Sequence, residues 1–244
     1  MNYIQAQDAF ESGILVYNKR QLPYRFLLPE NYSPEQSYPL LIFLHGAGER
    51  GSDNSLQLVH GSEYFLAPEI RSQFPAIVVF PQCPKEGYWA SIKSRSGSNK
   101  FEYYRRPRSN PYLRGVEKLI KDFQKNYTID TDRIYVGGLS MGGMGTYELV
   151  YRNPRKFAAA FAICGGAHPK TAKRLRRPAW RIDHGDMDDV VPLILSQRMV
   201  DALNQNQANV QWNIHKGVGH DSWDQVFSDS SWLPWLFSHS LKTP

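Results

Sequence analysis

The sequence contains little cysteine and no long hydrophobic run. Its 244 residues include two cysteines, Cys83 and Cys164, which are too few for a disulfide framework. The longest apolar stretches, PLLIFL and AIVVF, are as long as strands and far shorter than the roughly 20 residues of a membrane-spanning helix. The first residues, MNYIQAQDAFESG, lack the basic start and apolar core of a signal peptide. We therefore expect a cytoplasmic protein without membrane contact, although a leader removed before residue 1 would leave the same sequence.

Acidic residues are scarce in the two segments that carry much of the positive charge. The net charge is +6, and residues 84–114 hold eight Lys and Arg against two Glu. Residues 170–181 hold six Lys and Arg and no acid, so the remainder of the chain is net negative. Basic patches of this kind occur in nucleic-acid-binding proteins. No nucleic-acid-binding motif accompanies them, so we expect no nucleic-acid partner.

The pattern of strands and helices predicts an α/β fold. Short β-type runs alternate with helical patterns, and two initial strands precede repeated strand–helix units, which favours a mostly parallel sheet covered by helices. Unbroken apolar runs are typical of strands buried on both faces. The length suits a single domain over residues 1–244. The expected strands are residues 13–19, 24–28, 40–45, 76–81, 133–137, 158–164, 179–184 and 210–215, and the expected helices are residues 63–72, 112–126, 141–151, 192–203 and 222–227.

Some local signals refine this prediction. Ser222 and Gln225 have the spacing of a capping box, and Pro192 suits the first position of a helix. The longest connection, about residues 82–111, is rich in Arg, Ser and Tyr, and long loops of this kind are usually functional or mobile. The loop includes Tyr103, Tyr104, Arg105, Arg106 and Arg108, which leaves two interpretations open: recognition of an acidic or aromatic substrate, or a solvated surface.

Ser140 is the candidate nucleophile. It lies in the glycine-rich stretch YVGGLSMGGMGTYEL, where GLSMG fits the G-x-S-x-G motif in the strand–turn–helix context that the motif requires. Gly138 and Gly142 leave room for the sharp turn, and the N–H of Met141 at the start of the next helix would face a developing negative charge. An isolated match is weak, and the alternative is a tight turn with no chemical role.

A serine nucleophile needs a base that is oriented by an acid. One predicted strand leads into GDMDDVVP, which offers Asp186, Asp188 and Asp189, and the next leads into KGVGHDSWD, which offers His220. Ligands of open α/β sheets bind at the carboxyl ends of the strands, where these side chains would meet. The chain order Ser, Asp, His is that of the α/β-hydrolases.

An oxyanion hole would complete the arrangement. The stretch HGAGERG follows a predicted buried strand, and its backbone N–H groups are candidates to bind the oxyanion together with the N–H of Met141. The best candidate among them is the N–H of Ala47. The remaining histidines are expected to have no catalytic role. They are His45, His60, His168, His184, His215 and His239.

Taken together, these motifs resemble the α/β-hydrolase superfamily, most closely phospholipase/carboxylesterase and dienelactone-hydrolase-like esterases, including predicted-peptidase and feruloyl-esterase-like members. The stretches are PLLIFLHGAGERGSDN, VVFPQCP, DRIYVGGLSMGGMGTYEL, HGDMDDVVP and GVGHDSWD, within residues 13–238. The resemblance implies an eight-stranded sheet in the order 1-2-4-3-5-6-7-8. Only 14 residues separate the predicted strands 158–164 and 179–184, so no large lid is expected. The resemblance also implies that the acid is Asp188, four residues before the proline of D-x-x-V-P. Because Cys83 and Cys164 would follow strands about 14 Å apart, beyond the ~7 Å limit of a disulfide, two free thiols are expected.

The sequence therefore predicts a serine carboxylesterase that acts on small or extended esters through an acyl-enzyme. His220 would take the proton of Ser140, and Asp188 would hold the imidazole ring. No metal or cofactor is expected, because no C-x-x-C, H-E-x-x-H or phosphate-loop motif occurs. Trp89 and Trp223 are candidates for an aromatic wall beside the ester, with core packing as the alternative for each. A peptidase with the same triad and a non-catalytic ligand-binding homologue are the competing functions, and the oligomeric state stays open.

Overall fold

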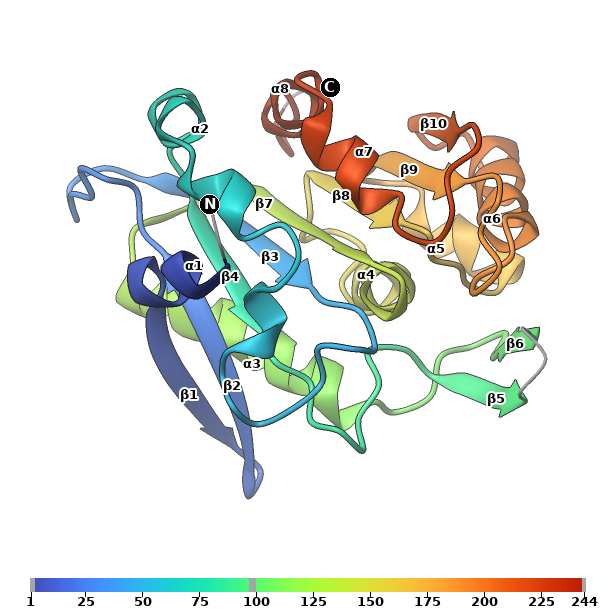
Figure 1. The fold of residues 1–244 in the computed structure, drawn as a ribbon, viewed down its shortest axis with the longest axis horizontal. Helices are drawn as coiled ribbons and strands as arrows, with labels where there is room; N and C mark the ends of the chain where they lie inside the picture. The colour runs from blue at the N-terminus through green and yellow to red at the C-terminus, as the bar shows by residue number, and fades with distance from the viewer. Residues whose placement is uncertain (1–2, 97–99, 243–244) are drawn as a thin grey trace.

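The computed structural model of the protein describes residues 3–96 and 100–242, and its centre is a sheet of eight strands (Figure 1). The strands of this sheet are β1 (Glu11–Tyr17), β2 (Arg20–Leu27), β3 (Tyr38–Leu44), β4 (Ile77–Pro81), β7 (Ile129–Leu139), β8 (Ala159–Ile163), β9 (Ala179–Gly185) and β10 (Val210–His215). They lie in the order β1-β2-β4-β3-β7-β8-β9-β10, which confirms the strand order that the resemblance implied. β2 pairs antiparallel with β1 and β4, and all other neighbours are parallel.

Helices cover both faces of the sheet. The helices are α1 (Tyr3–Ala9), α2 (Pro68–Gln73), α3 (Pro111–Asn126), α4 (Met141–Arg152), α5 (Ala172–Leu175), α6 (Ile194–Gln205), α7 (Trp223–Ser228) and α8 (Trp232–Phe237). Short 3₁₀ helices occur at η1 (Leu56–Leu58), η2 (Glu63–Leu66) and η3 (Pro169–Thr171). In the part of the chain that the structure describes, no helix has the length and hydropathy needed to cross a membrane.

The strand β3 shows why the core strands read as unbroken apolar runs. All seven of its residues are buried. Leu40, Ile42 and Leu44 pack in the cluster that includes the apolar sides of α3 and α4, whereas Leu41 and Phe43 pack in the cluster that includes α7 and α8. Successive strand residues point to opposite faces, so a strand covered on both sides needs an apolar residue at every position.

This topology brings the candidate residues together. β7, β8, β9 and β10 are parallel, so their carboxyl ends lie at the same edge of the sheet. Ser140 directly follows β7, Asp188 lies in the loop after β9, and His220 lies in the loop after β10.

The single helix expected over residues 63–72 is wrong. The segment forms the 3₁₀ helix η2 and then the helix α2, which begins at Pro68. Proline has no N–H to donate within a helix, and it disfavours the helical conformation of the residue before it. The residue before it, Ala67, accordingly has an extended conformation, with φ −59° and ψ 127°.

Two expected helix starts also differ from the structure. Pro192 precedes α6 by two residues, and its carbonyl accepts a hydrogen bond from the N–H of Leu195 in a short turn that leads into the helix. Ser222 does precede α7, but its side chain makes no capping bond, so the capping box is not formed. Ser222 already has helical φ and ψ, and a capping side chain needs an extended backbone instead.

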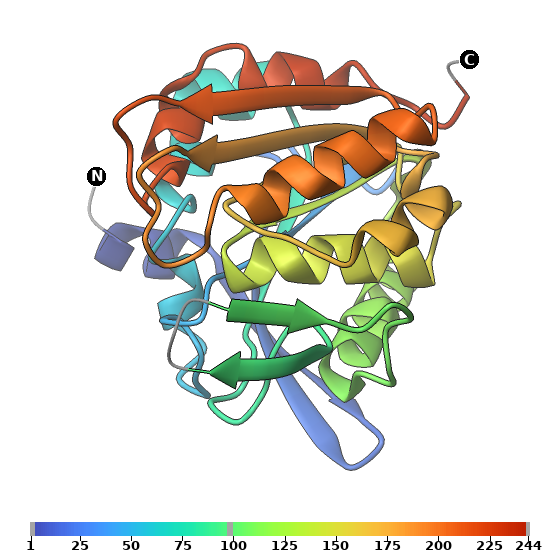
Figure 2. The same ribbon diagram turned by 90° about the vertical axis from the view of Figure 1, so that its right-hand side faces the viewer.

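The long connection of residues 82–111 contains structure that the sequence did not reveal. It forms a separate hairpin of β5 (Ile92–Ser96) and β6 (Lys100–Tyr103), which lies beside α4 in Figure 2. Ile92, Phe101 and Tyr103 of the hairpin pack against a small buried cluster that includes Met144 of α4. Few apolar side chains hold the hairpin in place, so no clear alternating pattern marks its strands.

Candidate active site

Ser140 occupies a strained turn between β7 and α4. Its φ is 53° and its ψ is −116°, a conformation that costs a non-glycine residue about 1–3 kcal/mol. Its N–H donates to the carbonyl of Ile163 at 2.8 Å, and its own carbonyl accepts from the N–H of Met144 at 3.0 Å. These bonds hold the turn in place, and the side chain of Ser140 is left half-buried at the start of α4.

The turn depends on close backbone approach at Gly142. A Cβ atom added there would lie 1.8 Å from the carbonyl oxygen of Leu44, and one added at Gly138 would lie 2.3 Å from the same oxygen. Backbone atoms cannot move aside as the end of a flexible side chain can. The glycines therefore allow the first turn of α4 to pack directly against the end of β3.

We expect Gly142→Ala to destabilise the fold, although Gly to Ala inside a helix normally adds about 1 kcal/mol of stability. The overlap with Leu44 should instead cost at least about 1–3 kcal/mol. The free energy of unfolding in urea measures the effect. Gly48→Ala is the matched control, because a Cβ atom at Gly48 meets nothing within 4 Å. Equal unfolding midpoints for the two variants would contradict this explanation.

A chain of two hydrogen bonds joins Ser140, His220 and Asp188. Nε2 of His220 lies 2.9 Å from Oγ of Ser140, and Nδ1 of His220 lies 2.8 Å from Oδ2 of Asp188. The side chain of Asp188 is fully buried, and that of His220 is 19% exposed. With Nδ1–H donating to the carboxylate, Nε2 presents its lone pair to the serine hydroxyl. The arrangement can therefore take a proton from Ser140.

The carboxylate of Asp188 accepts four hydrogen bonds. Its Oδ1 accepts from the N–H groups of Val190 and Val191 at 2.9 Å and 2.8 Å. Its Oδ2 contacts both Nδ1 of His220 and Nε2 of His184, the latter at 3.1 Å. Burial alone would raise the pKa of Asp188, but the hydrogen bonds from His184, His220 and Val191 outweigh it and hold the pKa well below its usual value. The group is therefore a carboxylate at neutral pH.

The neighbouring aspartates have different surroundings. Oδ1 of Asp186 accepts from the N–H of Gly217 at 2.7 Å, and Oδ2 pairs with Lys216 at 3.2 Å. Asp189 is exposed on the same loop. Of the three acids that the sequence offered, Asp188 is thus the one whose carboxylate lies against the ring of His220.

His184 is the residue of this site that the sequence interpretation missed. It is completely buried in β9, and its Nε2 lies 2.8 Å from the carbonyl oxygen of Val191, besides its contact with Asp188. Its Nδ1 lies 2.7 Å from Oγ of Ser196, whose own proton is donated to the carbonyl of Gly165 at 2.6 Å. Both ring nitrogens therefore face acceptor atoms. His184 acts as a second donor to Asp188, on the side away from His220.

His45 has a structural role in the loop after β3. Its Nε2 accepts from the N–H of Cys83 at 2.9 Å, so its Nδ1–H donates to the carbonyl of Gly46 at 2.6 Å. Burial lowers the pKa of His45 to about 4, and the ring stays neutral. These bonds fix the loop after β3, where a Cβ atom on Gly46 would lie 3.7 Å from Cβ of Ser140. Ala47 follows in this loop and is half-buried against the core.

Trp89 and Trp223, the two candidates for an aromatic wall, differ in burial and in their neighbours. Trp89 is completely buried, with its ring edge-on to His45 at 5.4 Å between centroids, so it belongs to the core and offers no surface to a substrate. This corrects its assignment as a substrate wall. Trp223 is half-buried, with ring centroids 5.5 Å from His220 and 4.9 Å from His60. Trp223 lines a groove of about 480 Å³ together with His60, Tyr64 and Phe227.

Cys164 lies directly beneath this site. Its Sγ and the nearest ligand atoms of Asp188 and His220 lie within 4.8 Å of one another, a donor set that would suit a soft metal ion. Burial raises the pKa of the thiol far above its usual value, so the thiolate that binds metals does not form at neutral pH. Cys164 and Cys83 are both free, as expected.

A mostly parallel sheet, a strained serine turn and side chains in the order Ser, Asp, His define the α/β-hydrolase fold, which confirms the fold class predicted from the sequence. Residues 31–231 match the model of the phospholipase/carboxylesterase family. The chain belongs to that family.

Several similar proteins are esterases. A bifunctional acetylxylan esterase/xylanase from Neocallimastix patriciarum is 30% identical over 168 residues, which are 67% of this chain and 21% of that protein. A probable feruloyl esterase C from Aspergillus oryzae is 25% identical over 217 residues, which are 88% of this chain and 73% of that protein. The crystal structure of a thermostable esterase has 32% identity and a TM-score of 0.86, and the match covers 96% of this chain and 64% of that one. The chain thus spans only part of the bifunctional relative and of the thermostable esterase.

Proposed function

We propose that this protein hydrolyses carboxylic esters through an acyl-enzyme formed on Ser140. The observation that supports the proposal most directly is the hydrogen-bond chain from Ser140 through His220 to Asp188, with distances of 2.9 Å and 2.8 Å. Such a chain supplies the base that a serine needs to act as a nucleophile.

In the first half of the reaction, Oγ of Ser140 attacks the ester carbonyl carbon while its proton passes to Nε2 of His220. Asp188 accepts the Nδ1–H bond and stabilises the imidazolium that forms. The tetrahedral intermediate collapses as the bond to the alcohol oxygen breaks, and His220 gives its proton to that oxygen. In the second half, water attacks the acyl carbon while it loses a proton to His220. The bond from the acyl carbon to Oγ of Ser140 then breaks, the acid is released, and His220 returns the proton to Oγ. No step needs a metal or a cofactor.

The N–H groups of Met141 and Ala47 are proposed to hold the oxyanion. Met141 is the first residue of α4, and the first N–H groups of a helix have no partner within it. Ala47 lies in the loop that His45 fixes against Ser140. Losing one such donor typically costs about 3 kcal/mol of transition-state stabilisation.

Hydrolysis of a panel of 4-nitrophenyl esters from acetate to octanoate, with methyl ferulate and acetylated xylan added, tests the proposal. The last two substrates follow from the activities named for the similar proteins. Matched peptide anilides are included, and a fluorophosphonate probe with mass spectrometry locates the reactive serine. We expect ester turnover and labelling of Ser140. Turnover of anilides with no ester turnover would favour a peptidase, and no labelling of Ser140 would favour a binding role.

We further propose that His184 is a positioning residue that acts through Asp188. His184→Phe removes the donor to Oδ2 of Asp188 at 3.1 Å, and we expect kcat to fall about 10–100-fold as the carboxylate shifts. The charge of Asp188 would then act on His220 alone, so the acidic limb of the kcat/KM profile should move to higher pH. Ser196→Ala, which removes the bond at the other ring nitrogen, is the matched control. An unchanged pH profile in His184→Phe would show that His184 serves packing only.

A further inference from the structure

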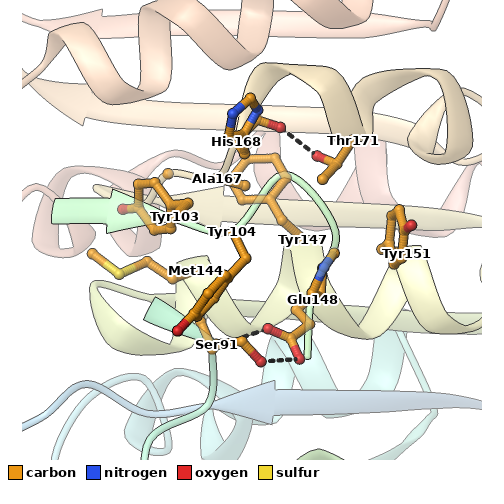
Figure 3. Close-up of a pocket in the computed structure, with 13 residues that line it drawn as sticks. Ser91, Tyr103, Tyr104, Met144, Tyr147, Glu148, Tyr151, Ala167, His168 and Thr171 are labelled. Carbon is orange, nitrogen blue, oxygen red and sulfur yellow. Dashed lines mark hydrogen bonds between the residues drawn. The ribbon is translucent and has the colours of Figure 1, made fainter. Parts of the chain in front are cut away.

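The two basic segments found in the sequence meet at one pocket beside α4. Figure 3 shows the pocket, with Tyr103 and Tyr104 contributed by the first segment and Thr171 by the second. Met144, Tyr147 and Glu148 of α4 form its wall. The two segments are separated by 55 residues in the chain, and only the fold brings them together. We refer to this site as the tyrosine pocket.

Three cations lie close to the lining of the tyrosine pocket, and we refer to them as its rim. Nζ of Lys93 lies 5.8 Å from the centre of the Tyr104 ring, and Arg105 follows Tyr104 in the chain. The N–H of Lys170 donates to Nδ1 of His168 at 3.2 Å, and besides burial the charges of all three residues lower the pKa of His168. Within residues 3–96 and 100–242, no carboxylate lies at ion-pair distance from any of these three cations. Like charges held together without counter-charges destabilise a fold, and such clusters attract anionic ligands.

The charges of Glu148 and Arg181 are already balanced. Glu148 in the wall accepts from both the N–H and the hydroxyl of Ser91, at 2.5 Å and 3.0 Å (Figure 3). It also pairs with Arg152 at 2.6 Å. Arg181, the last residue of the second basic segment, is buried and bonded to Asp183 and Asp229. Glu148 therefore does not neutralise the rim, and Arg181 does not add to it.

The pocket also contains hydroxyl groups that have no partner. The hydroxyls of Tyr103 and Tyr147 are buried and make no hydrogen bond to any residue that the structure describes. The Tyr147 side chain is only 1% exposed, and its ring stacks on Trp180 with centroids 4.8 Å apart. A buried hydroxyl without a partner is unfavourable. Both groups can donate to the oxygen atoms of a ligand.

The size and position of the pocket limit what it can take. The free space inside is about 20 Å³, which suits about one or two water-sized groups and is too small for a ring. A carboxylate fits this space. Met144 lies four residues after Ser140 in α4, which places it about 6 Å farther along the helix axis. The wall of the pocket therefore begins about one helical turn from Ser140.

We propose that the tyrosine pocket binds the carboxylate of an ester substrate that carries this negative charge a few bonds from the ester. The hydroxyls of Tyr103 and Tyr147 donate to the carboxylate oxygens, and Lys93, Arg105 and Lys170 supply the positive potential that attracts it. This inference rests on the proposed esterase function and deepens it by naming the substrate class.

The test compares half-esters of dicarboxylic acids with neutral esters of the same length. The anionic substrates are 4-nitrophenyl hydrogen adipate and suberate, and the neutral ones are 4-nitrophenyl hexanoate and octanoate. We expect kcat/KM to favour the anionic member of each pair, mainly through a lower KM. Exposed charges act weakly one by one, so three cations together should give about a tenfold preference at low salt, and the preference should shrink in 0.5 M NaCl.

Matched variants test whether the preference for anionic esters arises at the tyrosine pocket. Lys93→Ala/Arg105→Ala/Lys170→Ala should abolish the preference for the anionic ester, and Tyr103→Phe, which keeps the ring, should reduce it. The control, Lys118→Ala/Lys121→Ala/Lys125→Ala, removes the same charge from the exposed face of α3 and should keep the preference. Equal kcat/KM for anionic and neutral esters in the wild type, or equal loss in the α3 control, would overturn the proposal.

A binding measurement keeps the pocket testable if the proposed esterase function fails. Calorimetric titration of Ser140→Ala with monomethyl adipate detects binding without turnover. We expect the added rim substitutions to weaken this binding about tenfold. No turnover of any ester would contradict the esterase function alone, whereas equal binding with and without the rim cations would contradict the pocket.

Discussion

Replacing Ser140 by alanine is expected to lower kcat for ester hydrolysis by about 10⁴–10⁶-fold, because no acyl-enzyme can form without Oγ. The oxyanion donors and substrate binding would leave a small residual rate. Alanine keeps the Cβ atom and only loses the hydroxyl, so the turn at φ 53° should stay intact. Steady-state kinetics on 4-nitrophenyl butyrate, after removal of trace contaminants, measures the loss.

The interpretation of this loss requires an intact fold. Circular dichroism and the urea midpoint of Ser140→Ala should match the wild type, because the bond from Oγ to His220 lies in a half-exposed site. Ser12→Ala, at an exposed serine of β1, is the control and should keep full activity. If Ser140→Ala retained a tenth of the activity, another nucleophile would be at work.

The fold was predictable because several strands of its sheet, such as β3, β4, β8 and β9, are buried on both faces. Runs such as residues 40–44 leave few alternatives to a core strand, and each of the eight expected strands has its counterpart in the sheet. The hairpin of β5 and β6 was not predictable, since contacts to Met144 hold it and no pattern of its own marks it. The helix expected over residues 63–72 is interrupted because Pro68 disfavours a helical conformation at Ala67.

The candidate site was predictable where chemistry needs a local motif. The turn around Ser140 has its glycines in sequence, and His220 follows a strand end, so both could be identified from the residues alone. The choice of Asp188 among three acids came from the resemblance to a family, because nothing in the local sequence separates them. His184 and the tyrosine pocket depend on contacts between distant segments, which periodicity and spacing do not reveal.

Asp188→Asn is expected to lower kcat about 10⁴-fold while the geometry of the site is kept. The amide has one oxygen and one NH₂ group, and the N–H groups of Val190 and Val191 need the oxygen as their acceptor. The NH₂ group then faces His220 and favours the tautomer with its proton on Nε2. That nitrogen cannot accept the proton of Ser140. Asp186→Asn and Asp189→Asn are the matched controls and should keep most of the activity, and an equal loss in Asp189→Asn would assign the acid to that residue.

Asp188→Asn should also change how the stability of the fold depends on pH. The pKa of Asp188 is lower in the folded protein than in the unfolded chain, so its charge stabilises the fold at pH values above the unfolded pKa, and this contribution is lost as the pH falls. Asp188→Asn should therefore be less stable than the wild type at pH 7, and the difference should shrink as the pH falls below about 4, where an unfolded aspartate takes up its proton. Urea unfolding of both proteins at pH 7 and below pH 4 measures this difference in stability. A difference that stays constant with pH would mean that the bonds from His184 and His220 do not depend on the charge of the carboxylate. That result would contradict the proposal that the charge of Asp188 stabilises the imidazolium of His220.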